Sequence, residues 1–121
     1  MTKTILVIED DEDSQRIMRD LLTSAGYEVI EAVTGQEGVT AAETLSPELI
    51  LMDIQLPDFD GYEATRRIKA NPTLRGIPII AVTSYALSGD DVKAFEAGCD
   101  AYVTKPFSPR ALLAKIREYL E

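Results

Sequence analysis

Five side chains that could carry chemistry stand at or near the ends of short apolar runs. They are Glu9, Asp10, Asp53, Thr83 and Lys105. A carboxylate that attacks a phosphoryl group becomes an acyl phosphate, which is a recognised covalent intermediate. Because the transferred group carries charge on its equatorial oxygens, positioning and electrostatics do most of the catalysis. The set therefore suits a nucleophilic Asp53, with Thr83 and Lys105 holding phosphoryl oxygens.

The three carboxylates also suggest a metal ion, since they would repel one another without a positive charge between them. The chain has no histidine and a single cysteine, Cys99. Zinc sites built on histidine and a Ser-His-Asp triad are therefore excluded, and no internal disulfide can form. Any metal must bind to oxygen, which favours magnesium, manganese or calcium. Magnesium suits the set best, because it takes few protein carboxylates and shares phosphate oxygens with the protein.

The positions of these side chains depend on strands and helices that alternate along the chain. Apolar runs predict buried strands at 5–8, 27–32, 49–53, 79–83 and 101–103, the second being more polar and nearer the sheet edge. Caps, prolines and glycines mark the helices that follow them. These run from Asp13 or Ser14 to Gly26, from Thr34 to Ser46, over 62–70, around Val92 and Phe95, and from Ser108 onward. We expect Ile17 and Leu45 to face the core.

This order, β-α repeated five times without a linker, predicts one domain over residues 1–121. The fold class is α/β, a (βα)5 doubly wound five-stranded parallel sheet of flavodoxin-like order 2-1-3-4-5 with right-handed crossovers. The order reverses between the first and third strands. Glu9 and Asp10 are therefore expected beside Asp53, in the crevice at the carboxyl ends of the strands.

Each of these residues also has an ordinary structural interpretation. The acidic run 9–11 could cap and charge the first helix, and Asp53 could be a turn residue. Thr83 could be a plain strand residue and Lys105 a surface lysine. What favours the functional interpretation is the joint pattern, in which each central strand ends in a residue that the chemistry needs.

The charge of the chain limits its partners. Twelve Lys and Arg against 21 Asp and Glu give a net charge of −9. Such acidity argues against direct binding to nucleic acid or to anionic lipid, and it fits a partner with a basic patch. No apolar run approaches the length of a transmembrane helix, and Met1 leads directly into a strand without a signal peptide. We therefore expect a cytoplasmic protein.

Four stretches of the sequence together resemble the receiver domain of two-component response regulators, the CheY-like family. The stretches are 5–11, 51–57 with 60–61, 81–83 and 102–107, and they span the whole chain. The resemblance implies that Asp53 accepts a phosphoryl group from a histidine kinase or a histidine phosphotransfer protein. It implies that Thr83 and Lys105 bind the phosphoryl oxygens. Such a chain catalyses only its own phosphorylation and dephosphorylation and serves as a signalling switch.

The resemblance also implies a Mg²⁺ site. Asp10 and Asp53 would ligate the ion, with the backbone carbonyl of Gln55 as a third protein ligand, and Glu9 would act on it through water. Glu9 stands where the family most often has Asp. Because Glu is one methylene longer, we expect the ion to sit differently or to lose more of its waters.

A switch and a tuned phosphate lifetime are further implications of the resemblance. Tyr102 corresponds to the aromatic switch, which turns inward when Thr83 moves toward the phosphoryl group. Gln55 and Tyr85 lie where family members tune the lifetime of the phosphate, and Ser84 stands where a smaller residue is usual. We hypothesise slow self-dephosphorylation, because the bulky Tyr85 would hinder the attacking water.

Output is expected from a partner protein, because no second domain follows Glu121 and an effector domain would need roughly another 100 residues. The expected docking surface covers the last two β-α units, residues 85–98 and 102–120. The resemblance also predicts a cis peptide bond at Lys105-Pro106.

Other interpretations compete with this one. A degenerate receiver that binds partners without phosphorylation is disfavoured, because no residue essential for phosphorylation is missing. A phosphohydrolase with an Asp nucleophile needs a second Asp where Gln55 stands. A flavodoxin-type nucleotide module needs a phosphate loop where the acidic run 9–11 lies. A receiver cut from a larger regulator or hybrid kinase would have the same sequence features.

Overall fold

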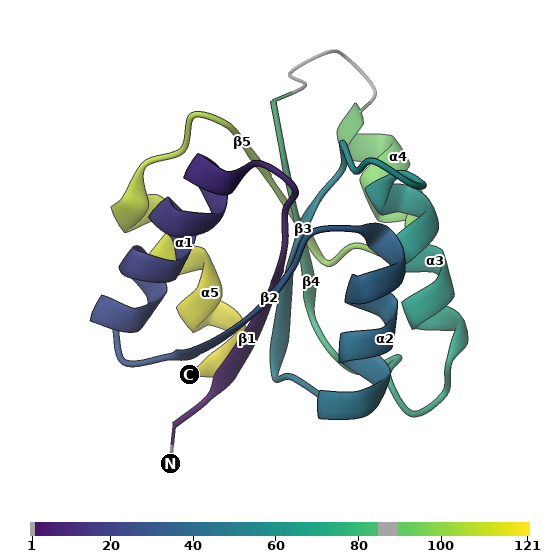
Figure 1. The fold of residues 1–121 in the computed structure, drawn as a ribbon, viewed down its shortest axis with the longest axis horizontal. Helices are drawn as coiled ribbons and strands as arrows, with labels where there is room; N and C mark the ends of the chain where they lie inside the picture. Colours follow the sequence, from purple (N-terminus) through teal and green to yellow (C-terminus); the bar gives the residue numbers. More distant parts are fainter. Residues whose placement is uncertain (1, 85–89) are drawn as a thin grey trace.

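The computed structural model describes residues 2–84 and 90–121, where strands and helices alternate strictly (Figure 1). The strands are β1 (Thr4–Ile8), β2 (Glu28–Ala32), β3 (Leu49–Asp53), β4 (Ile79–Thr83) and β5 (Ala101–Thr104). The helices are α1 (Glu12–Ser24), α2 (Gly35–Leu45), α3 (Gly61–Ala70), α4 (Asp90–Ala97) and α5 (Pro109–Leu120). Every strand pairing is parallel and the order is β2-β1-β3-β4-β5. The predicted fold class and strand order are thereby confirmed. Among the described helices, none has the length and apolarity that crossing a bilayer requires.

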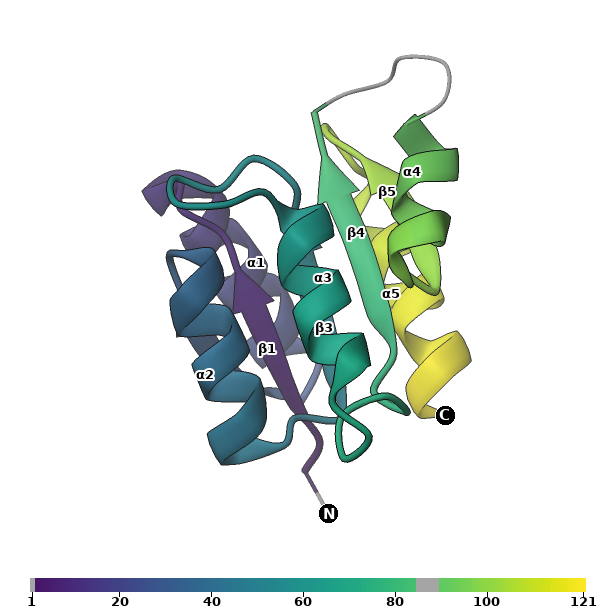
Figure 2. The ribbon, with the colours of Figure 1, turned by 90° about the vertical axis from the view of Figure 1, so that its right-hand side faces the viewer.

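Helices cover both faces of the sheet. α1 and α5 lie on one face, and α2, α3 and α4 lie on the other (Figures 1 and 2). Successive side chains of a strand point to opposite faces. β1 accordingly sends Ile5 and Val7 into one core cluster, and Leu6 and Ile8 into the other. All side chains of β3 and β4 are buried as well, so the three central strands are held from both sides.

The strand registers bring the functional positions level with one another. β1 and β3 are paired up to Ile8 and Met52, so the next residue of β1, Glu9, lies alongside Asp53. The last residues of β4 and β5 are paired in the same way, which places Thr83 at the same edge of the sheet. This edge is the carboxyl end of the parallel strands, where ligands bind in open α/β sheets.

The helix starts follow the predicted caps with one correction. Thr34 and Ser108 cap α2 and α5 as predicted. α1, however, is capped by Asp11, whose carboxylate accepts a hydrogen bond from the backbone N–H of Ser14 at 2.9 Å. Asp11 has the extended backbone that an N-cap needs, whereas Asp13 and Ser14 already lie in the first turn of the helix.

Two apolar side chains that were expected to face the core are exposed. Ile17 on α1 is 55% exposed and Leu45 on α2 is 54% exposed. The buried stripe of α1 consists of Gln15, Met18 and Leu22, spaced by three and four residues, and Ile17 lies beside it. Leu45 is the last residue of α2, past its buried turns.

Candidate functional site

Three carboxylates gather at the carboxyl edge of the sheet, as the strand order predicted. Glu9 and Asp10 follow β1, and Asp53 ends β3. One oxygen from each of the three lies within 4.8 Å of the others. Glu9 is 1% exposed and Asp53 is 6% exposed, whereas Asp10 is open to solvent. The acidic run 9–11 is therefore divided between two roles, because Asp11 caps α1 while the other two face the crevice.

Lys105 brings a positive charge to the carboxylates from the turn after β5. Its Nζ lies 2.5 Å from Oε1 of Glu9 and 3.9 Å from Oδ2 of Asp53. One ammonium cannot neutralise three carboxylates. Oε2 of Glu9 is buried and has no hydrogen-bond partner among the residues that the structure describes. The crevice therefore has negative charge that Lys105 does not neutralise, and a carboxylate oxygen of Glu9 is available to bind a cation.

The environment of Asp53 works against its ionisation. Burial raises the pKa of its carboxyl from 3.8 to about 8, and the Glu9 carboxylate adds to this increase. The Lys105 ammonium and the backbone N–H of Gln55, which donates to Oδ1 at 3.3 Å, oppose it only in part. A cation in the crevice would favour the ionised form of the Asp53 carboxyl.

The donor set fits a magnesium ion. Three convergent carboxylates, one with a buried oxygen that has no partner among the described residues, offer the hard oxygen ligands that Mg²⁺ prefers. Glu9, Asp10 and Asp53 are the residues that would hold the ion. The resemblance also named the backbone carbonyl of Gln55, and Gln55 is an exposed residue two positions after Asp53.

The hydroxyl and the lysine reach the same edge from neighbouring strands. Thr83 ends β4 and is fully buried. The backbone N–H of Lys105 donates to the carbonyl of Thr83 at 2.7 Å, so the two residues are tied through the backbone. The peptide bond between Lys105 and Pro106 is cis, as the resemblance predicted.

The positions assigned to switching and phosphate lifetime are only partly described. Tyr102 on β5 is half-buried and packs against the core cluster on the face of α2, α3 and α4. Ser84 is exposed, directly after β4. Tyr85 lies outside the described residues, so the hypothesis on its bulk stays a prediction.

Sequence reasoning missed one buried polar residue beside the site, Gln15. Its Nε2 donates to the carbonyl oxygens of Glu9, Ala32 and Val7 at 3.1, 3.2 and 3.3 Å. A signal was available, because Gln15 stands three residues before Met18 on the apolar stripe of α1. A polar residue on such a stripe must find hydrogen bonds within the core.

A second missed residue, Asp58, ties the loop after Asp53 to a helix. Its carboxylate accepts hydrogen bonds from the backbone N–H groups of Gly35 and Gln36, at 2.8 and 2.9 Å, at the start of α2. Nothing in the local sequence indicates this contact, because the partners are 22 and 23 residues away.

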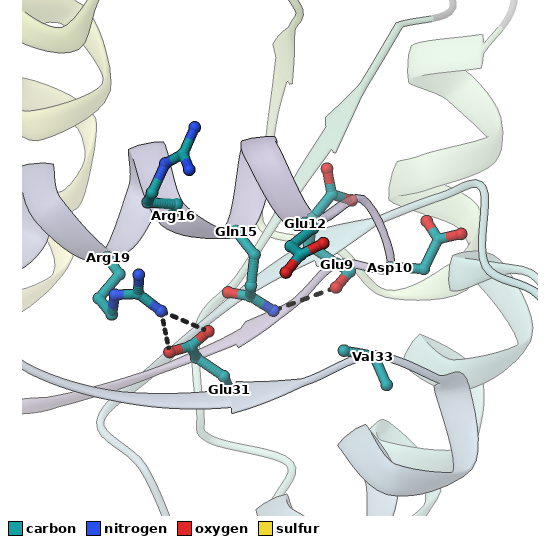
Figure 3. A pocket seen from close by; sticks show the side chains of 8 residues that line it. All are labelled: Glu9, Asp10, Glu12, Gln15, Arg16, Arg19, Glu31 and Val33. Atoms are coloured by element: carbon teal, nitrogen blue, oxygen red, sulfur yellow. Dashed lines mark hydrogen bonds and ion pairs between the residues drawn. The ribbon is translucent and has the colours of Figure 1, made fainter.

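Hollows in the described part of the chain lie beside residues of the site. One, of about 580 Å³, lies between α1 and β2 and is bordered by Asp10, Gln15 and the Arg19–Glu31 ion pair (Figure 3). Another, of about 490 Å³, includes Lys105 and the exposed Ile17. Glu9 and Asp10 thus border the first hollow, and Lys105 borders the second.

Comparisons with known proteins agree with this geometry. Residues 5–117 match the family model of the response regulator receiver domain. The polar-differentiation response regulator DivK of Brucella ovis is 42% identical over 120 residues, which covers 99% of this chain and 98% of the relative. The corresponding DivK of Brucella abortus (strain S19) is equally similar over the same share of each chain.

Solved structures are similar along the whole chain. One is the receiver domain of a sensor histidine kinase from Pseudomonas aeruginosa, with a magnesium ion coordinated in its active-site cleft. It is 38% identical, with a TM-score of 0.93 over 99% of this chain and 98% of the other. Another is a CheY-like receiver domain protein from Methanospirillum hungatei, which is 40% identical, with a TM-score of 0.90 over 99% and 94% of the two chains.

Proposed function

Because the chain belongs to the response regulator receiver domain family, we propose that Asp53 is its phosphoacceptor and that Glu9, Asp10 and Asp53 hold Mg²⁺ there. Receiver domains are the phosphorylation-dependent signalling switches of two-component systems, and they are not enzymes that turn over a separate substrate. The observation that carries the proposal is the convergence of three carboxylates within 4.8 Å, with Lys105 beside them.

The phosphoryl group would come from a phosphohistidine of a histidine kinase or a histidine phosphotransfer protein. A carboxylate oxygen of Asp53 attacks phosphorus while the bond from phosphorus to the imidazole nitrogen breaks. The leaving nitrogen keeps the bonding electron pair and takes a proton from solvent. Bound Mg²⁺ supplies positive charge to the phosphoryl oxygens and to the Asp53 carboxylate.

The remaining groups of the site act on the phosphoryl oxygens. Lys105 pairs with Glu9 at rest, and its Nζ lies close enough to Asp53 to turn to a new oxygen on that residue. The buried Thr83 hydroxyl binds a further oxygen, which moves the end of β4. Gln55, Ser84 and Tyr85 set how fast water removes the phosphoryl group, and bulk at Tyr85 keeps this step slow.

Output would leave the molecule through α4, β5 and α5. Thr83 and Lys105 join β4 to the turn after β5 through a backbone hydrogen bond, so a change at either reaches Tyr102 on the adjoining strand. Val92 and Phe95 on α4 are 52% and 51% exposed. These apolar side chains, in a chain of net charge −9, suit a partner protein whose docking surface combines apolar contacts with basic residues.

The assignment can be tested with a small phosphodonor. Incubation with acetyl phosphate and Mg²⁺ should add a single phosphoryl group, measured by intact mass. The adduct should be absent without Mg²⁺ and absent in Asp53→Asn. Asp20→Asn, an exposed change on α1, is the matched control and should be phosphorylated normally. An adduct that survives Asp53→Asn, or no adduct on the wild type, would refute the proposal.

A further inference from the structure

The Gln15 side chain joins three backbone segments at the edge of the acidic crevice. It is 6% exposed. Its amide nitrogen meets carbonyl oxygens of β1, of β2 and of the residue that follows β1, Glu9. Figure 3 shows the amide pointing from α1 to the Glu9 carbonyl, below the Glu9 and Asp10 carboxylates. The hydrogen bond therefore links α1 to the Glu9–Asp10 segment that follows β1.

The bond to Glu9 matters because of where that carbonyl lies. It belongs to the peptide unit that joins Glu9 to Asp10, so its orientation sets the direction in which both side chains leave the backbone. The N–H of Glu9 is held as well, since it donates to the carbonyl of Ala32 at 2.9 Å. Gln15 and β2 thus fix both backbone polar groups of Glu9.

The carbonyl oxygen of the Gln15 amide adds nothing to the stability of the fold. Oε1 of Gln15 is buried without a hydrogen-bond partner in the described part of the chain. Turning the amide over would set this oxygen against three carbonyl oxygens, so the observed orientation is the only one that the surroundings favour. A buried acceptor that stays unsatisfied is a cost to folding. In return, the two N–H groups of Nε2 are shared among the three carbonyl oxygens.

We propose that Gln15 is a positioning residue for the cation site, which holds the Glu9–Asp10 peptide in the orientation that Mg²⁺ binding needs. The inference rests on the proposed magnesium site. Outer groups that orient metal ligands change metal affinity by about 10-fold to 100-fold when they are removed. Gln15 would act indirectly. It holds the backbone of the proposed ligands Glu9 and Asp10 and does not contact the ion.

The test is Mg²⁺ binding to the unphosphorylated full chain, measured by calorimetric titration with MgCl₂. Gln15→Met keeps the length of the side chain and removes both amide donors. Its dissociation constant for Mg²⁺ should rise by about 10-fold or more. The rate of phosphorylation by acetyl phosphate should return to the wild-type value once Mg²⁺ is saturating, because the nucleophile and Lys105 are untouched.

Gln36→Met is the matched control, because Gln36 is exposed on α2 and its amide nitrogen donates only locally, to Thr40. Its Mg²⁺ affinity should equal that of the wild type. If Gln15→Met does not fold, Gln15→Asn is used instead. Its side chain is one methylene shorter, which withdraws the amide from the carbonyl oxygens, and its dissociation constant for Mg²⁺ should rise in the same way. A variant that unfolds at lower temperature yet binds Mg²⁺ with wild-type affinity would overturn the inference. A wild-type chain that binds no Mg²⁺ would instead overturn the proposed magnesium site.

Discussion

Replacing Asp53 by Asn should stabilise the protein when no divalent cation is present. The carboxyl is buried beside Glu9, and these surroundings raise its pKa from 3.8 to about 8. In the unfolded chain the same group ionises above its ordinary pKa. The native state therefore binds a proton that the unfolded state releases, and the free energy of unfolding falls as pH rises from about 4 to about 8. Asn carries no charge at any pH, so the free energy of unfolding of the variant does not fall for this reason.

The size of the expected stabilisation follows from the shift in the pKa of Asp53. A change of about four pKa units corresponds to about 6 kcal/mol if Asp53 bore it alone. Glu9 shares the repulsion, Lys105 lies 3.9 Å from Asp53, and the neighbouring Asp10 is exposed to solvent. We therefore expect a gain of about 2 kcal/mol above pH 8, or about 8 °C in the unfolding temperature.

Urea unfolding in EDTA, at about pH 5 and about pH 8.5, measures this difference. The advantage of Asp53→Asn should be larger at the higher pH, and added Mg²⁺ should reduce it by stabilising the wild type more than the variant. Asp20→Asn provides the matched loss of an exposed carboxylate and should change stability little. Equal stability of Asp53→Asn and wild type at the higher pH, or a less stable variant, would show that the crevice does not penalise the ionised Asp53.

Two further predictions concern the switch and the lifetime of the phosphate. Thr83→Ala should still be phosphorylated, but the ratio of partner affinities for its phosphorylated and unphosphorylated forms should fall toward one, as measured by titration with a captured partner. Thr44→Ala, an exposed change on α2 outside the expected docking surface, is the control. A partner that still discriminates the two forms of Thr83→Ala contradicts the role of the hydroxyl. Tyr85→Ala should lose its phosphate several-fold faster than the wild type after the donor is removed, because the attacking water is no longer hindered; equal rates would show that Tyr85 does not set the lifetime.

The sequence predicts the sheet and the acidic cluster well because both depend on apolar runs. Short apolar runs bounded by turn residues favour central strands, and parallel strands end at one edge, so Glu9 and Asp53 were expected to meet once the strand order was inferred. Local detail is less well determined. After β1, Asp11, Asp13 and Ser14 can each cap a helix, and the choice of Asp11 depends on where the chain leaves the strand.

The contacts that sequence reasoning missed all join segments that are distant along the chain. Gln15 bonds to Ala32, 17 residues away, and Asp58 bonds to the start of α2, more than 20 residues away. Such partners become visible only when the layers are assembled. Ile17 was misplaced for a related reason, since a helix in isolation does not reveal which edge of its apolar stripe the sheet will cover.

The burial of β1, β3 and β4 on both faces has a consequence for how such a domain can change over evolutionary time. Each of these strands packs alternate side chains into the two cores, so a substitution at almost any of their positions disturbs one core or the other, and the frame that carries the acidic cluster is nearly closed to variation. Val92, Phe95 and Tyr119 lie outside both cores, on helices whose outer faces meet solvent. Such positions can be exchanged at little cost to folding. Under the proposed function, the surface that selects a partner can therefore diversify between lineages while the acidic cluster stays the same.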